Sequence, residues 1–254
     1  MMTTLKIVLE YDGTRYSGWQ EQKNSRTIMG EIRKAAHQIF KADFEIQGAG
    51  RTDAGVHALG QVMHIKVASE VRHSPEIIRS RLNDLLPADI AVLSVERAAR
   101  NFHARHDTAA RIYLYQISRR KQAFIKRYVW WIEDELNVQR MREAASMLVG
   151  RHDFICFRAS DPTRPHESTI VEIEGADIET EDDIIQFRIA GSHFLWRMVR
   201  RIVGALVKVG VGEITVSDFA HLVDGRCEGK FDVAAWTAPA SGLFLEEIRY
   251  NDLQ

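Results

Sequence analysis

The chain has 254 residues, of which 45% are hydrophobic and 27% charged, and its formal net charge is −1. This is the composition of an ordinary globular protein with ample core, in one large domain or two small ones. The N-terminal apolar run is too short for a signal peptide, and no segment approaches the roughly 20 apolar residues of a membrane helix. The two cysteines, Cys156 and Cys227, provide no disulfide framework and no CxxC metal pair, so we expect a reducing, cytoplasmic setting.

The first half of the sequence alternates strand and helix patterns. Residues 5–11 alternate in hydrophobicity and end at an Asp-Gly turn, which predicts a strand. We further expect a helix from 27 to 40, short strands at 44–47 and 61–67, a helix from 74 to 86 that starts with Ser-Pro, and a strand at 90–98. The order is β-α-β-β-α-β, that of the ferredoxin-like split βαβ.

The second half repeats this pattern without obvious sequence identity. We expect a strand at 111–118, a helix at 137–150, a hairpin of 168–179 with 183–190, helices at 194–210 and 215–225, and a closing strand at 243–250. The predicted fold class is therefore α+β, with two ferredoxin-like halves packed side by side and a cleft between them. We place the N-terminal half at residues 1–104 and the C-terminal half at 105–254.

Charge is distributed unevenly along the chain. Residues 97–127 hold nine Lys and Arg against one acid, a net charge of +8. Residues 133–183 hold fourteen acids against five Arg, a net charge of −9. Two solvated faces that differ by chance would give the same pattern, but such separation also indicates a face for a polyanion such as RNA or DNA.

The stretch GAGRTDAGVHALGQ (48–61) places one short carboxylate, Asp53, in a Gly-rich loop. Such clusters are most often turns, because Asp accepts hydrogen bonds from nearby N–H groups and Gly supplies positive φ. The alternative is a reactive carboxylate on a loop shaped so that a substrate can come close.

Two further groups of residues have both a structural and a functional interpretation. Arg197, Arg200 and Arg201 follow i, i+3, i+4 spacing on the predicted helix 194–210, which is otherwise apolar almost all round. They form a solvated edge, or they are buried and pair with a carboxylate such as Asp53. Tyr113 shares a strand face with Tyr115, and the two rings belong to the core or stack on a base.

Other common catalytic motifs are missing from the sequence. It contains no HExxH, no His/Cys cluster, no Walker loop and no GxSxG elbow. We therefore expect neither a metal nor a nucleotide cofactor.

Several blocks, in order, resemble the TruA family of tRNA pseudouridine synthases. GRTDAGVHA (50–58) looks like the catalytic motif of that family. The resemblance extends over nearly the whole chain through YDGTRYSGWQ (11–20), LNDLLPADIAV (82–92), FHAR (102–105), RIYLY (111–115), GRHDF (150–154), FLWRMVRRIVGALVKVG (194–210) and TAPASGLFL (237–245).

The resemblance implies an isomerase with a pseudouridine synthase fold that works as a homodimer without cofactor or metal. It cuts the N-glycosidic bond of uridines 38, 39 and 40 in the tRNA anticodon stem-loop, turns the base and rejoins it through carbon. Asp53 corresponds to the catalytic carboxylate, Tyr113 to the tyrosine that packs on the base, and Arg200 to the arginine that pairs with the carboxylate. RNA contacts are expected from Arg51, His57, Arg105, Arg111, Arg197 and Arg201.

Some alternatives stay open at this level. Asp53 attacks C6 of uracil, attacks C1′ of ribose or abstracts the 2′ proton, and the sequence does not choose among these routes. His106 and His193 depart from the family pattern, which puts fine substrate selection in doubt. Two rival functions use the same residues: an RNA-binding protein that does not modify tRNA, and a hydrolase that releases the free base.

Overall fold

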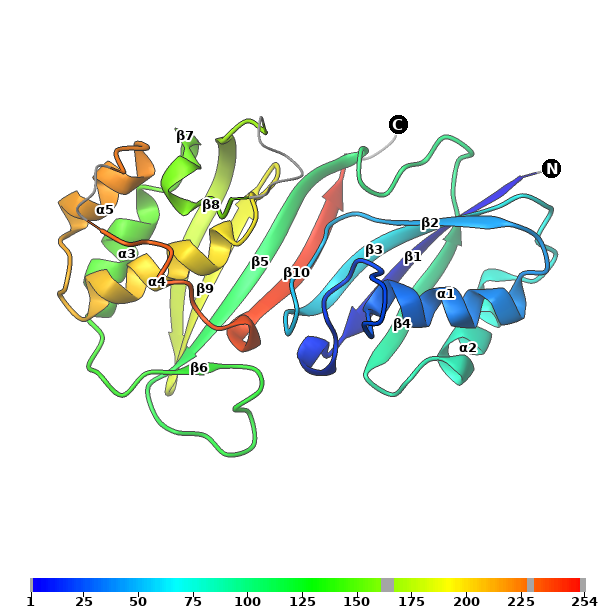
Figure 1. Ribbon diagram of the computed structural model, residues 1–254, viewed down its shortest axis with the longest axis horizontal. Helices are drawn as coiled ribbons and strands as arrows, with labels where there is room; N and C mark the ends of the chain where they lie inside the picture. The colour runs from blue at the N-terminus through cyan, green and yellow to red at the C-terminus, as the bar shows by residue number, and fades with distance from the viewer. Residues whose placement is uncertain (1, 161–166, 228–230, 252–254) are drawn as a thin grey trace. The chain divides into compact units, whose positions relative to one another are not determined.

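The computed structural model describes residues 2–160, 167–227 and 231–251 (Figure 1). The chain forms two compact units. Unit 1 contains the residues up to Ala109 and those from Phe244 onward, and unit 2 contains Ala110–Leu243. The last strand, which the sequence pattern placed at the end of the C-terminal half, thus belongs to unit 1. The domain boundary between residues 104 and 105 stays a prediction.

Unit 1 has the predicted order of elements. They are β1 (Thr3–Tyr11), α1 (Ile28–Ile39), β2 (Phe44–Gly48), β3 (His57–Val67), α2 (Pro75–Leu85), β4 (Ile90–Arg97) and, from the end of the chain, most of β10 (Leu243–Tyr250). The predicted helix starts are confirmed by their caps, because the Thr27 and Ser74 side chains accept hydrogen bonds from backbone N–H groups of α1 and α2. The description of this half as ferredoxin-like stays a prediction.

β3 organises the sheet of unit 1. β1 pairs with it antiparallel and β4 pairs with β1. The other edge of β3 is shared: β2 pairs antiparallel with its later residues, while β10 pairs parallel at His57 and Ala58. α1 and α2 lie next to each other on one face of this sheet, and the apolar stripe of α1 is buried (Figure 1).

Unit 2 has a sheet in the order β5-β9-β8-β7, with β6 paired to β5. The elements are β5 (Thr108–Ser118), β6 (Trp130–Trp131), α3 (Val138–Ser146), β7 (Gly150–Asp153), the 3-10 helix η2 (Phe154–Phe157), β8 (Ile170–Glu181), β9 (Ile184–Gly191), α4 (Met198–Gly210), α5 (Val216–Val223) and the 3-10 helix η3 (Ala240–Gly242). α3 packs against β8, and α4 and α5 pack against α3.

Two helices of unit 2 are shorter than predicted. α3 ends at Ser146 because the N–H groups of Met147 and Leu148 donate to Ala144 and Ala145, in a tighter turn. Gly150, predicted as the end of that helix, begins β7 instead, with a φ of 110°. α4 begins at Met198 and not at residue 194.

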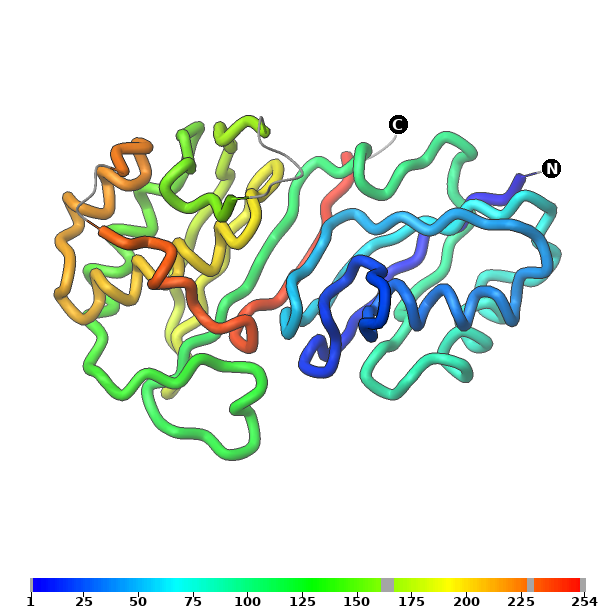
Figure 2. Tube along the Cα trace, in the orientation of Figure 1, coloured from blue at the N-terminus to red at the C-terminus, as the bar shows by residue number. Residues whose placement is uncertain are grey.

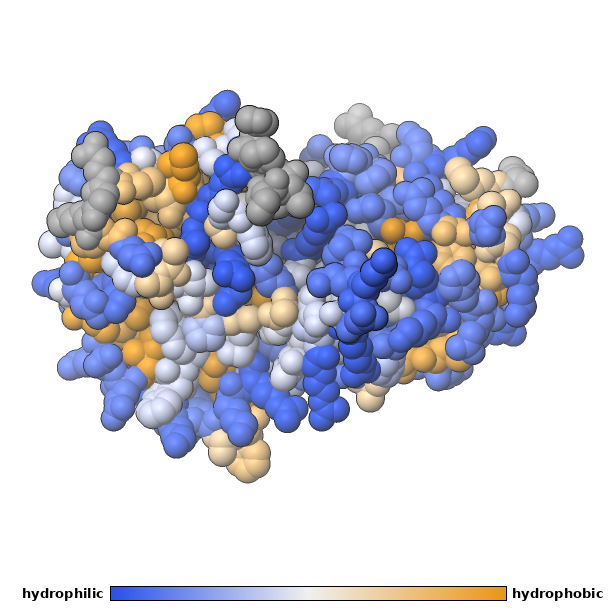
Figure 3. Space-filling model, in the orientation of Figure 1, coloured by the Kyte–Doolittle hydropathy of each residue, from blue (hydrophilic) through white to orange (hydrophobic). Residues whose placement is uncertain are grey.

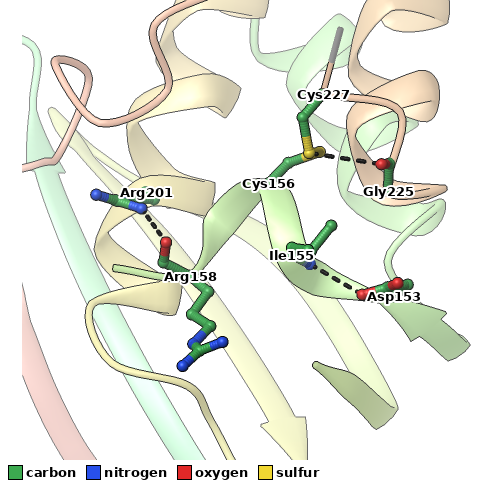
Figure 4. Close-up of a disulfide and its surroundings, with 7 residues drawn as sticks. All are labelled: Asp153, Ile155, Cys156, Arg158, Arg201, Gly225 and Cys227. Atoms are coloured by element: carbon green, nitrogen blue, oxygen red, sulfur yellow. Dashed lines mark hydrogen bonds between the residues drawn. A yellow bond between two sulfur atoms is a disulfide. The ribbon is translucent and has the colours of Figure 1, made fainter. Parts of the chain in front are cut away.

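Cys156 and Cys227 form a disulfide (Figure 4). This corrects the expectation that the two cysteines provide none. Cys156 is buried in η2, Cys227 is exposed after α5, and the bond joins positions 71 apart in sequence. Two cysteines so far apart carry no spacing pattern from which a pairing can be predicted. The expectation of a reducing setting from cysteine usage therefore loses its basis.

The described helices were also compared with the length of a membrane span. None of them is both long enough and apolar enough to cross a bilayer.

The core of unit 1 contains an ionisable side chain, His64 on β3. Its imidazole is fully buried, and Nδ1 accepts a hydrogen bond from the Ala104 N–H at 3.0 Å. Burial lowers the pKa of His64 to about 4, assisted by Lys66 and His103 and opposed by Glu45 and Asp107. The neutral ring is thus the form that the folded protein accommodates.

We predict that the free energy of unfolding falls as the pH drops through the range from 6.5 to about 4. In the unfolded chain His64 has the higher pKa and binds its proton first as the pH falls. The contribution of neutral His64 to the free energy of unfolding is therefore fully present above pH 6.5, and about 3 kcal/mol is lost within this range. Urea titrations at several pH values measure this effect. His64→Gln is expected to flatten the pH dependence, whereas His37→Gln, at an exposed position on α1, should leave it intact. An equally steep curve for His64→Gln would show that other groups cause the acid sensitivity.

Candidate active site

Asp53 lies on the loop of residues 49–56 that connects β2 to β3. It is partly exposed, whereas Thr52 and Val56 on either side are buried. The Asp53 carbonyl accepts a hydrogen bond from the Val56 N–H at 3.1 Å, which closes a turn, and Gly55 within this turn has a φ of 78°. The turn interpretation is therefore correct for the backbone, and Gly supplies the left-handed conformation that it requires.

The segment of residues 11–19 holds this loop by hydrogen bonds. The Trp19 N–H donates to the Thr52 carbonyl at 3.0 Å, and the Gly55 N–H donates to the Tyr16 carbonyl at 3.3 Å. The hydroxyls of Tyr11 and Thr52 lie 2.8 Å apart. Three bonds to one short segment fix the backbone on both sides of Asp53.

The close approach of the two segments depends on glycine. A Cβ on Gly13 would lie 1.9 Å from the Val56 carbonyl oxygen. A Cβ on Gly18, whose φ is 92°, would lie 2.7 Å from the Thr52 carbonyl oxygen. Any larger residue at either position would push the loop of residues 49–56 away, which is why these glycines accompany the Asp loop.

Gln61 anchors the first part of the loop from β3. Its side chain is fully buried. The amide nitrogen donates to the Gly50 carbonyl at 3.0 Å, and the amide oxygen accepts from the Gly50 N–H at 3.4 Å. One side chain thus satisfies both polar groups of Gly50. Sequence reasoning missed Gln61, because a single glutamine in an alternating strand has no distinguishing pattern.

Tyr16 adds a polar anchor beneath the same segment. The Tyr16 hydroxyl donates to the Asp89 carboxylate, and the Arg26 guanidinium lies 4.5 Å from the centre of the tyrosine ring. Burial and the hydrogen bond to Asp89 raise the pKa of Tyr16, so the hydroxyl keeps its proton and remains a donor.

His57, an expected RNA contact, has a different position. Its ring is 1% exposed, lies 4.8 Å from the Phe244 ring, and accepts a hydrogen bond from the Gly13 N–H at 3.1 Å. In unit 1 the ring supports the segment that holds the Asp53 loop and is covered by that segment. The structure therefore shows a supporting contact for His57, and its contact with RNA stays a prediction.

In unit 2, Tyr113 lies on β5 and is 8% exposed. The Phe194 ring packs against it edge-on, with centroids 5.1 Å apart. Tyr115, two residues on, donates to the Pro239 carbonyl at 2.8 Å, and burial raises its pKa. Gly242 lies so close that a Cβ there would meet the Tyr115 ring at 2.6 Å.

Arg200 is anchored by the same segment of residues 237–242. Its Nε donates to the Ala238 carbonyl at 2.7 Å, and the Ala238 N–H donates back to the Arg200 carbonyl at 3.1 Å. The charge of Arg200 also acts on Tyr115, where it opposes the effect of burial on the pKa. Unit 2 thus brings Arg200 and β5 together. Asp53 belongs to unit 1, and its pairing with Arg200 stays a prediction.

The sequence pattern predicted that Arg197 shares a helix face with Arg200 and Arg201. This prediction is wrong, because Arg197 lies before the helix. It precedes α4 with a φ of 58°, and its guanidinium lies 5.0 Å from the centre of the Trp196 ring. The residues before Arg197 form hydrogen bonds and a ring contact with other parts of unit 2. The Ser192 carbonyl accepts from Arg111, the Trp196 carbonyl accepts from the Ala159 N–H, and Phe194 covers Tyr113. These tertiary bonds replace the helical ladder before Met198.

The remaining expected RNA contacts differ in exposure. Arg51 is exposed and Arg105 is half-buried. Arg111 donates to the Ser192 carbonyl at 2.7 Å. Arg201 donates to the Arg158 carbonyl (Figure 4), and its Nε is buried without a hydrogen-bond partner among the described residues. Burial lowers the pKa of Arg201.

The two histidines that depart from the family pattern lie in different units. His106 is exposed, and its ring centroid lies 4.1 Å from that of His103. His193 is half-buried beside Ser192, with Nδ1 at 3.0 Å from the serine hydroxyl. Burial and the charge of Arg111 lower the pKa of His193.

Across the three described ranges, no group of three or more His, Cys, Asp or Glu side chains is arranged to hold a metal ion.

The close approach at Gly13 leads to a prediction. Gly13→Ala should lower the free energy of unfolding by about 1–3 kcal/mol, because the new methyl group overlaps the Val56 carbonyl. Gly175→Ala is the matched control, since the nearest atom to its Cβ would be 3.8 Å away, and should change stability by less than about 0.5 kcal/mol. Urea denaturation measures both. Equal effects would show that the two segments can separate freely.

Comparison of the sequence with a family profile and with curated proteins identifies one family. A family profile described as tRNA pseudouridine synthase matches residues 7–107 and 144–251. A protein of Thermotoga sp. (strain RQ2) named tRNA pseudouridine synthase A is 39% identical over 251 residues, which cover 98% of this chain and 100% of that protein. Proteins of Thermodesulfovibrio yellowstonii and Bacillus cereus, named tRNA pseudouridine synthase A and tRNA pseudouridine synthase A 2, are 36% and 35% identical with the same coverage.

These matches confirm the resemblance inferred from the sequence blocks, and they extend through both the loop of Asp53 and the helix of Arg200. The chain belongs to the tRNA pseudouridine synthase family.

Proposed function

We propose that this protein converts uridine to pseudouridine in the anticodon stem-loop of tRNA, at positions 38, 39 and 40, with Asp53 as the catalytic carboxylate. The observation that carries the proposal is the match over 98% of the chain to proteins named tRNA pseudouridine synthase A, together with the fixed Asp53 loop. The three positions in tRNA come from the family resemblance.

The reaction is a rearrangement within one nucleotide. The bond between N1 of uracil and C1′ of ribose breaks, and a bond between C5 and C1′ forms. The proton on C5 leaves and N1 takes up a proton, so the product is an isomer of the substrate. No oxidant, reductant or group donor is consumed, and one side chain that can act as nucleophile or base is sufficient.

The fixed loop suits Asp53 to this task. The backbone on either side of it is held by the bonds to Tyr16 and Trp19, and the aspartate side chain has only two torsions to order. Asp53 is partly exposed, so a flipped nucleotide can reach it. Attack on C6, attack on C1′ and removal of the 2′ proton all need this same placement.

Tyr113 and Arg200 complete the proposed site from unit 2. Tyr113 packs on the flipped base, and Arg200 pairs with the Asp53 carboxylate. The hydrogen bond from Nε to Ala238 orients the guanidinium fork of Arg200. A bidentate arginine keeps a carboxylate ionised where burial alone would favour its protonated form.

The same proposal covers the protein's partners and setting. The substrate is tRNA, the working form is a homodimer, and the reaction takes place in the cytoplasm without metal or cofactor. Arg51 and Arg197, both exposed, are proposed phosphate contacts that lie within three positions of Asp53 and Arg200 in sequence.

We predict that Asp53→Ala abolishes pseudouridine formation and leaves tRNA affinity within roughly tenfold, since phosphate contacts dominate binding. The measurement maps pseudouridine in an unmodified tRNA transcript over time and determines the Kd separately. Asp84→Ala, an exposed aspartate on α2, is the control and should keep full activity.

The same assay tests the rival functions. Substantial turnover by Asp53→Ala would remove Asp53 from catalysis. Tight binding by the parent protein without any modification would indicate an RNA-binding protein, and release of free uracil would indicate a hydrolase.

Arg200→Lys and Arg201→Lys form a matched pair of variants. The two arginines are adjacent on α4 and each donates to a backbone carbonyl, but only Arg200 is proposed to pair with Asp53. Arg200→Lys should lose at least about tenfold in single-turnover rate, because Lys keeps the charge and not the fork. Arg201→Lys should lose much less. If both variants lose activity equally, or Arg200→Lys matches the parent, the proposed pairing is wrong.

A further inference from the structure

The loop of residues 119–129 between β5 and β6, which we name the basic loop, is anchored at its base. The Arg119 N–H donates to the Asp183 carbonyl at 2.9 Å, and the Ser118 hydroxyl donates to the Arg120 carbonyl at 2.7 Å. On the returning side, the Gln116 amide donates to the Tyr128 carbonyl at 3.2 Å. The chain between these bonds extends away from the sheet of unit 2 as the green loop below β6 (Figure 2).

The basic loop carries Phe124, whose side chain is 98% exposed. This is the largest exposed fraction of any large apolar side chain in the described ranges. Single exposed apolar residues are common and do not by themselves mark a binding site. The chemical surroundings of this ring therefore have to show what it contacts.

Those surroundings are cationic, although Arg120, at the base of the loop, forms an ion pair with Asp183. The nine residues 119–127 contain five Lys and Arg and no acid, and all five basic side chains are exposed. The Lys121 ammonium lies 5.7 Å from the centre of the Trp131 ring, which is 41% exposed. In the hydropathy view the lower edge of unit 2, where the loop lies, shows hydrophilic residues in blue beside a tan, apolar tip (Figure 3). An exposed aromatic ring among cations is the usual construction of a single-stranded nucleic-acid contact.

We propose that Phe124 stacks on an unpaired base of the tRNA, while Lys121 and Lys126 contact neighbouring phosphates. This inference rests on the proposed function, since it takes tRNA as the substrate. The nucleotide is not the one that reacts. Tyr113 and Ser118, the last residue of β5 before the basic loop, are five steps of extended strand apart, a distance of roughly 17 Å. Phe124 is thus a binding residue for a second nucleotide and has no part in the chemistry.

A second copy of this chain is a poorer occupant of the same surface. A stable protein interface needs a desolvated apolar centre of several side chains. The basic loop offers one ring within a group of charges whose removal from water is unfavourable. Phosphates neutralise such charges and release counterions, whereas an apolar partner surface does not.

Binding of unmodified tRNA transcript by Phe124 variants tests the proposal. Phe124→Ala should weaken the Kd by about 5-fold to 100-fold, as expected for the loss of one base–aromatic stack. Phe124→Trp should bind like the parent. Phe124→Leu should bind like Phe124→Ala, because leucine keeps apolar area and has no aromatic face. Ile77→Ala, at an apolar side chain of α2 that is 46% exposed, is the control and should have no effect.

Salt dependence separates stacking from charge. The slope of log K against log salt, which is negative, should be unchanged in Phe124→Ala. In Lys126→Ala it should become less steep by about one, as expected for one lost phosphate contact. In turnover assays Phe124→Ala should raise KM and keep kcat. Parent-like affinity of Phe124→Ala, or full binding by Phe124→Leu, overturns the proposal.

Sedimentation of the variants tests whether Phe124 contacts tRNA or a second copy of this chain. If Phe124→Ala changes the oligomeric state and its affinity loss disappears at protein concentrations that restore the parent's state, the ring contacts a second copy and the proposal is wrong. The proposed function fails on a different result, the absence of pseudouridine in the transcript treated with parent protein. The binding comparison among the Phe124 variants does not depend on that result.

Discussion

The contact between the segment of residues 11–19 and the loop of residues 49–56 is the constraint on which the candidate site depends. Two stretches of backbone meet there without side chains between them, because Gly13 and Gly18 leave room only for carbonyl oxygens. The hydrogen bonds across this contact determine where Asp53 is held. His57, Gln61 and Tyr16 support it from three directions with buried polar groups. The carboxylate that we propose to react is thus attached to a backbone fixed by hydrogen bonds, although its stretch of sequence is rich in glycine.

Unit 2 positions its own residues by a comparable method. The segment of residues 237–242 bonds to Arg200 through Ala238 and to Tyr115 through Pro239, so a helix and a strand are tied by one stretch of irregular chain. Before α4 the chain gives up helical hydrogen bonds so that Phe194 can cover Tyr113. In both units, irregular backbone rather than regular secondary structure sets the orientation of the residues proposed to react.

Local signals in the sequence predicted much of this structure. The order of elements in unit 1 follows from periodicity, and the cap at Ser74 follows from a side chain that bonds to a nearby N–H group. GRTDAGVHA is a string specific enough to identify a family, and the catalytic role that it assigns to Asp53 stays a prediction. The same resemblance assigned Tyr113 and Arg200, whose roles stay predictions.

The features that could not be predicted all depend on long-range contacts. The apolar run from residue 194 predicts a helix. Nothing local shows that Phe194 packs against Tyr113 of β5 or that the Trp196 carbonyl accepts a hydrogen bond from Ala159. His57 looks accessible within a Gly-rich motif until Phe244, 187 positions later, is placed against it. The disulfide and the role of Gln61 likewise appear only when distant segments meet.

The pairing of β10 with β3 has a consequence for the order in which the chain can fold. β3 follows the Asp53 loop directly, and its first residues pair with a strand formed by the end of the sequence. During synthesis on the ribosome, unit 2 can be complete while this edge of unit 1 still lacks its partner. The supporting contact between His57 and Phe244 therefore has a large sequence separation and becomes possible only after unit 2 has been translated. A nascent or prematurely terminated chain would contain every proposed reactive residue and yet leave the Asp53 loop without that support.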